Sequence, residues 1–507
     1  MNSRLVKNTV IVLGCSVIAK VFSYIWEAVL AAYLGATEQA DAFYMTTSIY
    51  TILYPVLDLG IWKVFLPIYK ENMIRDKEHA DSFANLSLTF FGMISVGLVL
   101  FLIVFARPLT ILVAPGFAGN KQIATIHYLR IAAPTYLLMA SSSVIGAMLQ
   151  CHDRFLGSQI RELGTHVSKI VYVLIFYRQF GIFAAVTAMI VGSFFRFLIQ
   201  LPFIDWNWKF RWNFHFRAPQ MIPMLKGLPS VALTAAVQNL HGLVDKILAS
   251  GAPDGAVSCL NYGNKLISAF SGMFSIAIGT ATYPTMIQYI VEKQYEKLSE
   301  LILNIFEKLI FVILPVTVFC IFFSSDIVHV AFQRGLFDSA ATDLTASVFL
   351  GYSLGMLFTG LTTILANVYY GFGNTQLNLL FSIIEIVLNI IFNLMLFKPL
   401  GVAGLAVATS IAAFGGFCLR VLFLKKFVRV SYLKSTNEIL KILLVSLAAA
   451  GMPRLIFEYW MIRIVWLRFA LTVVLFAVIF LAGALMVKSS TMRSMTNAVM
   501  RTMQRKK

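Results

Sequence analysis

Long apolar runs recur along the whole chain, and they constrain its fold more than any other feature. The stretch "SVIAKVFSYIWEAVLAAYLG" (16–35) is typical: it is long enough to cross a hydrocarbon core of roughly 30 Å. Only helices and closed barrels can cross a bilayer, because its core holds no water to satisfy the backbone. The runs lack the period-two alternation of barrel strands. The sequence therefore predicts an all-α polytopic membrane protein.

The apolar runs predict about fourteen transmembrane helices. We assign them to four regions: 1–204 is an N-terminal six-helix lobe, 205–225 a cytoplasmic linker rich in basic residues and tryptophan, 226–430 a C-terminal six-helix lobe, and 431–507 two extra helices with a basic cytoplasmic tail.

The basic residues predict the orientation of the chain in the membrane. The formal net charge of +18 would suggest nucleic acid in a soluble protein, but this chain is 59% hydrophobic. Its lysines and arginines gather in alternate loops such as "KENMIRDK" and "WNWKFRWNFHFR". The positive-inside rule places these loops, and with them both termini, in the cytoplasm. We expect a phospholipid bilayer as partner and no nucleic acid.

An internal repeat relates the two predicted lobes. Glu27 lies in "IWEAVLAAYLG" and Asp245 in "LVDKILASGAP", and a proline follows each acid after about forty residues. The offset between matching segments is about 218 residues. Because each copy holds an even number of spans, both have the same orientation. Two parallel six-helix repeats around a cavity are a recurring transporter plan.

Two charges stand in the middle of the first span. Lys20 and Glu27 are nearly two turns apart, so they share one helix face but lie about 10 Å apart along its axis. A charge at the bilayer centre costs at least about 2.5–3.5 kcal/mol, so it normally faces a cavity or a partner. We infer that this face lines a water-filled lumen. The alternative is that each charge pairs with a neighbouring helix.

Other predicted spans carry further polar groups. The second holds Asp58 and Lys63, and Lys63 either faces the lumen or extends to the membrane surface. The eighth holds Asn264 and Lys265. Lysine binds phosphate as a point charge, so the central lysines favour an anionic substrate.

The eleventh predicted span places Glu385, Asn389 and Asn393 on one stripe, four residues apart. Hydrogen bonding between helices would explain this stripe. Carboxylate and amide oxygens also suit hard cations, so a cation site is the sharper hypothesis.

Short motifs give the chain a family resemblance. They occur in one order, and together they resemble the lipid II flippase family (MurJ/MviN type) of the multidrug/oligosaccharidyl-lipid/polysaccharide exporter superfamily. The motifs are "ADAFY" (40–44), "FLPIYKE" (65–71), "VAPGF" (113–117), "LRIAAPTYLL" (129–138), "DRF" (153–155), "LVDKILAS" (243–250), "LNYGNKL" (260–266) and "GTATYPT" (279–285).

The resemblance implies two six-helix lobes in a V and two extra helices in a bacterial inner membrane. It also implies transfer of an undecaprenyl-diphosphate-linked saccharide, either lipid II or a related cell-wall or polysaccharide precursor, to the outer leaflet by alternating access. No cofactor is expected, and transport would be coupled to sodium or to the membrane potential.

The resemblance also assigns residues to these roles. It implies diphosphate contacts for Lys20 and Lys265, to which we add Lys63. The family usually has further arginines where this sequence has Trp26 and the pair Tyr54-Pro55. The residues that we expect to line or gate the cavity are Glu27, Asp41, Asp58 and Asn264. The candidate Na⁺ ligands are Asp245, Asn389, Asn393 and Thr409.

Two other functions compete with this hypothesis. A multidrug/cation antiporter of the same superfamily would need an acidic lumen, which the central lysines disfavour. A membrane enzyme of cell-envelope glycan assembly would need a catalytic acid cluster. The sequence shows no paired-carboxylate, nucleophile or metal-ligand motif, so we expect a transporter rather than an enzyme.

Overall fold

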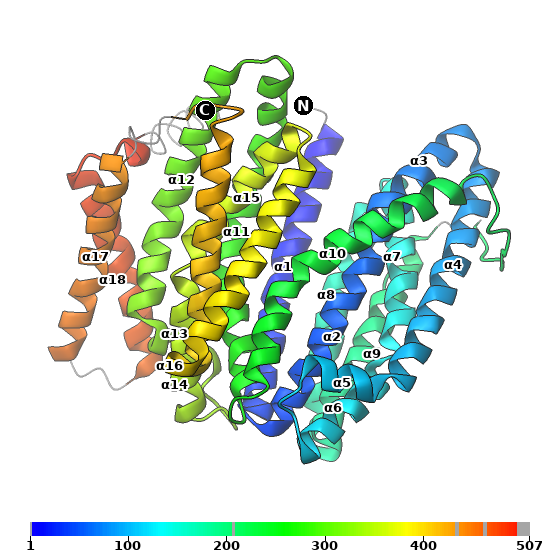
Figure 1. Cartoon of the computed structure of the whole chain (residues 1–507), viewed down its shortest axis with the longest axis horizontal. Helices are drawn as coiled ribbons and strands as arrows, with labels where there is room; N and C mark the ends of the chain where they lie inside the picture. Colours follow the sequence, from blue (N-terminus) through cyan, green and yellow to red (C-terminus); the bar gives the residue numbers. More distant parts are fainter. Residues whose placement is uncertain (1–2, 205–207, 431–435, 460–463, 494–507) are drawn as a thin grey trace. The chain divides into compact units, whose positions relative to one another are not determined.

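A computed structural model describes residues 3–204, 208–430, 436–459 and 464–493, and every regular element in these ranges is helical (Figure 1). The chain divides into two compact units. Unit 1 comprises Met1–Ser258 with Gly335–Phe337, and unit 2 comprises Cys259–Arg334 with Asp338–Lys507. The all-α membrane fold predicted from the sequence is confirmed.

Unit 1 contains twelve of the described elements in chain order. They are α1 (Ser3–Leu34), α2 (Glu38–Gly60), η1 (Ile61–Phe65), α3 (Leu66–Arg75), α4 (Lys77–Val104), α5 (Ala106–Val113), α6 (Gly119–Ala132), α7 (Thr135–Cys151), α8 (Phe155–Phe180), α9 (Ile182–Leu198), η2 (Leu201–Phe203) and α10 (Met221–Ala249). α1 packs against α8, α8 against α9, and α7 against both α4 and α9. α10, which the sequence analysis assigned to the second lobe, packs against α2.

Unit 2 contains most of α11 (Ala256–Val291) and the helices that follow it. α11 begins in unit 1, and the rest are α12 (Tyr295–Phe322), α13 (Ser324–Phe332), α14 (Ser339–Ser353), α15 (Met356–Gly371), α16 (Thr375–Leu424), α17 (Thr436–Tyr459) and α18 (Val465–Met486). The last two correspond to the predicted extra pair, and both pack beside α12 through contacts such as Phe319–Phe476, whose ring centroids lie 5.0 Å apart.

The predicted number of fourteen spans is not confirmed. Among the described residues, eight helices are long and apolar enough to cross a membrane, or up to ten if each bent pair forms one span. The bent pairs are α6 with α7, at 40°, and α14 with α15, at 42°. α16 is one element of 50 residues, although Gly401 (φ 58°, ψ −141°) breaks it between two predicted spans.

The internal repeat is visible in the backbone. Gly181, between α8 and α9, has φ 53° and ψ −137°, which nearly match the angles of Gly401. A positive φ is strained for residues with a side chain, and glycine adopts it freely. The same glycine break therefore separates α8 from α9 in the first repeat and the two parts of α16 in the second.

Two further contacts in unit 1 are related by the repeat. The Gly116 amide donates to Ser250 Oγ at 3.1 Å, and the Leu336 amide donates to the Ala32 carbonyl at 2.9 Å. The loop before α6 thus contacts the end of α10, the first helix of the second repeat. The loop before α14 contacts the end of α1, the first helix of the first repeat. This exchange explains why Gly335–Phe337 belongs to unit 1.

Candidate functional site

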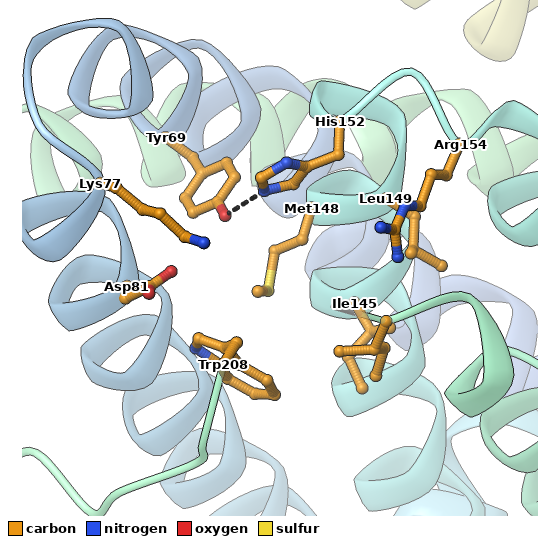
Figure 2. A pocket seen from close by; sticks show the side chains of 10 residues that line it. Tyr69, Lys77, Asp81, Ile145, Met148, Leu149, His152, Arg154 and Trp208 are labelled. Atoms are coloured by element: carbon orange, nitrogen blue, oxygen red, sulfur yellow. Dashed lines mark hydrogen bonds between the residues drawn. The ribbon is translucent and has the colours of Figure 1, made fainter. Parts of the chain in front are cut away.

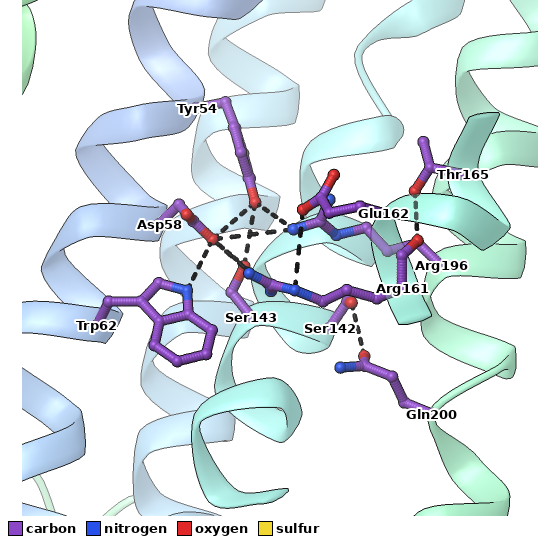
Figure 3. Close-up of polar contacts among 10 residues, drawn as sticks. All are labelled: Tyr54, Asp58, Trp62, Ser142, Ser143, Arg161, Glu162, Thr165, Arg196 and Gln200. Carbon is purple, nitrogen blue, oxygen red and sulfur yellow. Dashed lines mark hydrogen bonds and ion pairs between the residues drawn. The ribbon is translucent and has the colours of Figure 1, made fainter. Parts of the chain in front are cut away.

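Four charged side chains meet between α2, α8 and α9, and we call Asp58, Arg161, Glu162 and Arg196 the buried charge cluster (Figure 3). Its two arginines are buried, with Arg196 2% exposed, whereas the side chains of Asp58 and Glu162 are 22% and 42% exposed. Arg196 Nη1 lies 2.7 Å from Glu162 Oε1, and Arg196 Nη2 donates to the Tyr54 hydroxyl at 2.9 Å. This arginine therefore joins an acid on α8 to the polar face of α2.

Asp58 Oδ1 is the central acceptor of the cluster. It accepts hydrogen bonds from Tyr54 at 2.7 Å, from Trp62 Nε1 at 3.3 Å and from the Ser143 hydroxyl. Tyr54, Asp58 and Trp62 are four residues apart, so one face of α2 and η1 presents all three. Arg161 Nη1 lies 3.8 Å from the same oxygen, and its guanidinium stacks on the Trp62 ring at 4.9 Å.

The cluster contains two cations and two anions, so its formal charges cancel. An unpaired charge in a low-dielectric interior costs several kcal/mol, which pairing and hydrogen bonding offset. The arrangement can hold four helices of unit 1 in register, because Ser143 adds α7 to the three that carry the charges.

Unit 2 has a similar ion pair in the corresponding region of the repeat, although not at the corresponding residues. Arg420 Nη1 lies 3.0 Å from Glu385 Oε2, and the other guanidinium nitrogens donate to Asn378 and Ser382 at 3.2 and 3.1 Å. Glu385 and Arg420 lie on the two parts of α16 on either side of Gly401, as Glu162 and Arg196 lie on either side of Gly181. Glu385 thus has an ion-pair partner that the stripe on the eleventh span did not reveal.

The three lysines predicted to contact diphosphate are all exposed on their elements. Lys20 lies on α1 and Lys63 in the π-helix η1, both in unit 1, whereas Lys265 lies on α11 in unit 2. Asn264, beside Lys265, is also exposed and accepts a hydrogen bond from Ser268 at 3.4 Å. Their roles stay predictions.

Two of the acids predicted to line or gate the cavity are buried in unit 1. Glu27 is 5% exposed and accepts a hydrogen bond from the Tyr44 hydroxyl at 3.0 Å. Asp41 is fully buried, and its Oδ2 lies 2.7 Å from Lys121 Nζ. The backbone amides of Gly255 and Ser258 also donate to Asp41, at 2.9 and 2.8 Å. Asp41 therefore ties α2 to α6 and to the loop that precedes α11.

The candidate Na⁺ ligands fall in both units. Asp245 is buried on α10 in unit 1. In unit 2, the Asn389 amide donates to Thr409 Oγ1 at 3.0 Å, and the Asn393 amide donates to Asn389 Oδ1 at 3.2 Å. The structure thus brings the last three together, and the cation site as a whole stays a prediction.

The sequence analysis missed Arg161, Glu162 and Arg196. All three lie within predicted spans, and an ionisable residue inside a span is itself a signal of a partner. Lys169 is a further example, because its Nζ lies 5.0 Å from the centre of the Trp26 ring. Lys169 of α8 therefore contacts Trp26, and Arg196 of α9 contacts Tyr54. Both aromatic residues stand where the family that the sequence resembles usually has arginine.

Comparison with known families identifies one match along most of the chain. The family model described as "Lipid II flippase MurJ" matches residues 30–492. The chain is 24% identical over 419 residues to a probable lipid II flippase MurJ of Rickettsia prowazekii, covering 81% of this chain and 82% of the relative. It is 27% identical over 397 residues to the corresponding protein of Borreliella burgdorferi, covering 76% and 78%.

Solved structures show the same fold. A lipid II flippase MurJ in an inward closed conformation superposes with a TM-score of 0.79 at 20% identity, covering 93% of this chain and 97% of that chain. An inward-facing multidrug resistance transporter of the MATE family gives 0.66 at 16% identity, covering 81% and 96%.

Proposed function

This chain belongs to the lipid II flippase MurJ family, and we propose that it carries lipid II, an undecaprenyl-diphosphate-linked saccharide, from the cytoplasmic to the outer leaflet by alternating access. The observation that carries the proposal is the family match over residues 30–492, which includes most of both units. The relatives and the fold favour this transport over the export of soluble cations.

The diphosphate is proposed to bind Lys20 and Lys265, with Lys63 as a further contact. All three side chains are exposed, so their ammonium groups are accessible to a ligand. By contrast, Arg161 and Arg196 are held by Asp58 and Glu162. The exposed lysines are therefore the better phosphate contacts in this chain.

Transport by the full chain in proteoliposomes tests this proposal. A labelled polyprenyl-diphosphate saccharide is placed in both leaflets, and an impermeant quencher reports how fast the inner pool becomes accessible. We expect Lys20→Ala and Lys265→Ala to slow transport about tenfold or more, and Lys20→Arg to retain most of it. Lys297→Ala, at an exposed lysine of α12, is the matched control.

A binding assay with the same saccharide distinguishes a direct contact between the lysines and the diphosphate from a purely structural role of the lysines. If Lys20→Ala and Lys265→Ala bind it as tightly as the unaltered chain, the lysines do not hold the diphosphate. If the unaltered chain moves no saccharide faster than empty vesicles, the proposed transport itself is wrong.

We also propose coupling to sodium through Asp245, Asn389, Asn393 and Thr409. Oxygen ligands of this kind suit hard cations, and three of the four already form one hydrogen-bonded group. Asp245→Asn should abolish any stimulation of transport by a sodium gradient. Transport that ignores sodium but follows an imposed membrane potential would refute this coupling.

Both termini are proposed to be cytoplasmic. The turn between α1 and α2 and the loop after α10 should then face outward, and Gln39, in the first turn of α2, and Pro253 are exposed there. Cysteines at these two positions should react with an impermeant thiol reagent applied to intact cells. Labelling only after the cells are opened would reverse the orientation.

A further inference from the structure

The segment 208–217 alternates strictly between aromatic and polar side chains, "WKFRWNFHFR". It contains no helix from 208 to 215, and it is fastened along α4. The Asn85 amide donates to the Lys209 carbonyl at 3.2 Å, and the Asn213 backbone amide donates to Thr89 Oγ1 at 3.2 Å. These contacts hold the alternating segment, which we call the aromatic strap, against the side of unit 1.

Beneath the aromatic strap lies an apolar groove with a volume of about 740 Å³. Its floor is one face of α7, and α4 and the end of α9 form its walls. Gly92 opens the α4 wall, because a Cβ at this position would meet nothing within 4 Å. Trp208, Phe210 and Trp212 of the strap line one end.

Trp208 also lines a small second pocket (Figure 2). Trp208, Ile145 and Ile204 line both this pocket and the groove. Lys77 of α4 and Arg154, which precedes α8, line the second pocket on opposite sides, together with the acid Asp81. Charged side chains of both signs therefore lie close to the groove.

The strap carries basic side chains of its own. Lys209 and Arg211 are exposed on either side of Phe210. The strap itself contains no acid between residues 208 and 217. Its charge is therefore positive beside a groove that is almost entirely apolar.

We propose that the groove under the aromatic strap binds an anionic phospholipid. One acyl chain occupies the groove, and the phosphate lies beside the exposed Lys209 and Arg211 of the strap. A volume of about 740 Å³ lies within the range of roughly 300–1,000 Å³ of small-molecule sites. Tryptophan is suited to the boundary between acyl chains and headgroups, and clustered basic residues favour anionic over zwitterionic lipids.

This site lies wholly within unit 1 and contains none of the residues proposed for the lipid-linked saccharide. It therefore adds a second lipid ligand rather than another part of the transport path. The strap is held by α4 and the groove is built on α7 and α9, so a bound lipid would link these elements.

Binding of phosphatidylglycerol to the detergent-purified full chain, followed by native mass spectrometry, tests the proposal. Each basic residue near a membrane surface contributes about fivefold in affinity, so Lys209→Gln with Arg211→Gln should weaken binding about thirtyfold. Gly92→Leu fills the groove and should weaken binding about tenfold or more. Phosphatidylcholine should bind more weakly than phosphatidylglycerol to the unaltered chain.

Gly97→Leu is the matched control. Gly97 lies on the same helix, a Cβ there also meets nothing within 4 Å, and it does not line the groove. Both substitutions remove a helical glycine, so Gly92→Leu and Gly97→Leu should have similar thermal stability. Equal binding of phosphatidylglycerol by the two variants would overturn the proposal. Displacement of bound phosphatidylglycerol by a polyprenyl-diphosphate saccharide, with no preference for anionic phospholipid, would overturn it as well.

Discussion

Replacing Arg196 by methionine should destabilise unit 1, because it removes the shortest ion pair of the buried charge cluster. The Arg196 side chain is 2% exposed, and its Nη1 lies 2.7 Å from Glu162 Oε1. Breaking a buried pair costs about 3–5 kcal/mol, since the remaining charge loses its partner. Glu162 is 42% exposed and Arg161 Nε stays 3.8 Å from it, so solvent and the second arginine offset part of this loss. We therefore expect a loss below this range, about 2 kcal/mol.

Two companion variants test whether the unpaired acid causes the loss of stability. Arg196→Met with Glu162→Gln removes both charges, and replacement of a whole pair is often close to neutral. The double variant should therefore lose only about 1 kcal/mol, less than Arg196→Met alone. Arg178→Met, at an exposed arginine of α8, should change stability by less than about 0.5 kcal/mol.

Equilibrium unfolding of the full chain in mixed detergent micelles measures these free energies. The expected order of stability is unaltered chain, double variant, then Arg196→Met. If the double variant is as unstable as the single one, the loss comes from packing around the long side chain and not from an unpaired acid. A loss below about 1 kcal/mol for Arg196→Met would show that the cluster does not hold the helices together.

Three further predictions use the same unfolding measurement. Arg420→Met in unit 2 should cost about 3 kcal/mol, because its partner Glu385 is only 19% exposed, and a loss below about 1 kcal/mol would show that this pair does not stabilise unit 2. Asp41→Ala removes the 2.7 Å partner of the buried Lys121 ammonium, which keeps only the exposed Asp254 at 3.0 Å, and should cost about 3 kcal/mol; a change within about 0.5 kcal/mol would show that the pair adds no net stability. Gly335→Ala should destabilise more than Gly181→Ala: both glycines have positive φ, worth roughly 1–2 kcal/mol, but only at Gly335 would a Cβ meet a backbone atom, the Ala32 oxygen. Equal losses at the two glycines would refute the close approach.

The helical fold and its repeat could be predicted from the sequence, because the hydropathy and charge of each apolar run are local properties of that run. The first span illustrates this, since α1 ends at Leu34 within the predicted stretch. The two extra helices appear as α17 and α18 for the same reason. The number of spans was less predictable, because the bends between α6 and α7 and between α14 and α15 depend on packing as well as on composition.

The partners of the polar residues were decided only by the tertiary structure. Asp58 and Glu385 were recognised as unusual, since a charge inside an apolar run is costly wherever it lies. Their partners Arg196 and Arg420 could not be read from spacing. Arg196 meets Tyr54 across 142 residues of chain, and the rotation of α9 about its axis selects that contact.

The sequence by itself determined that this chain spans a membrane, that its two halves are related, and that cations and acids occupy the spans. The tertiary structure decided which charges neutralise each other and which remain exposed: Arg161 and Arg196 are paired, whereas Lys20 and Lys63 are exposed. The physical reason is that burial cost is a property of each residue in its run, whereas an ion pair needs two helix faces brought within about 4 Å, and only packing sets that distance.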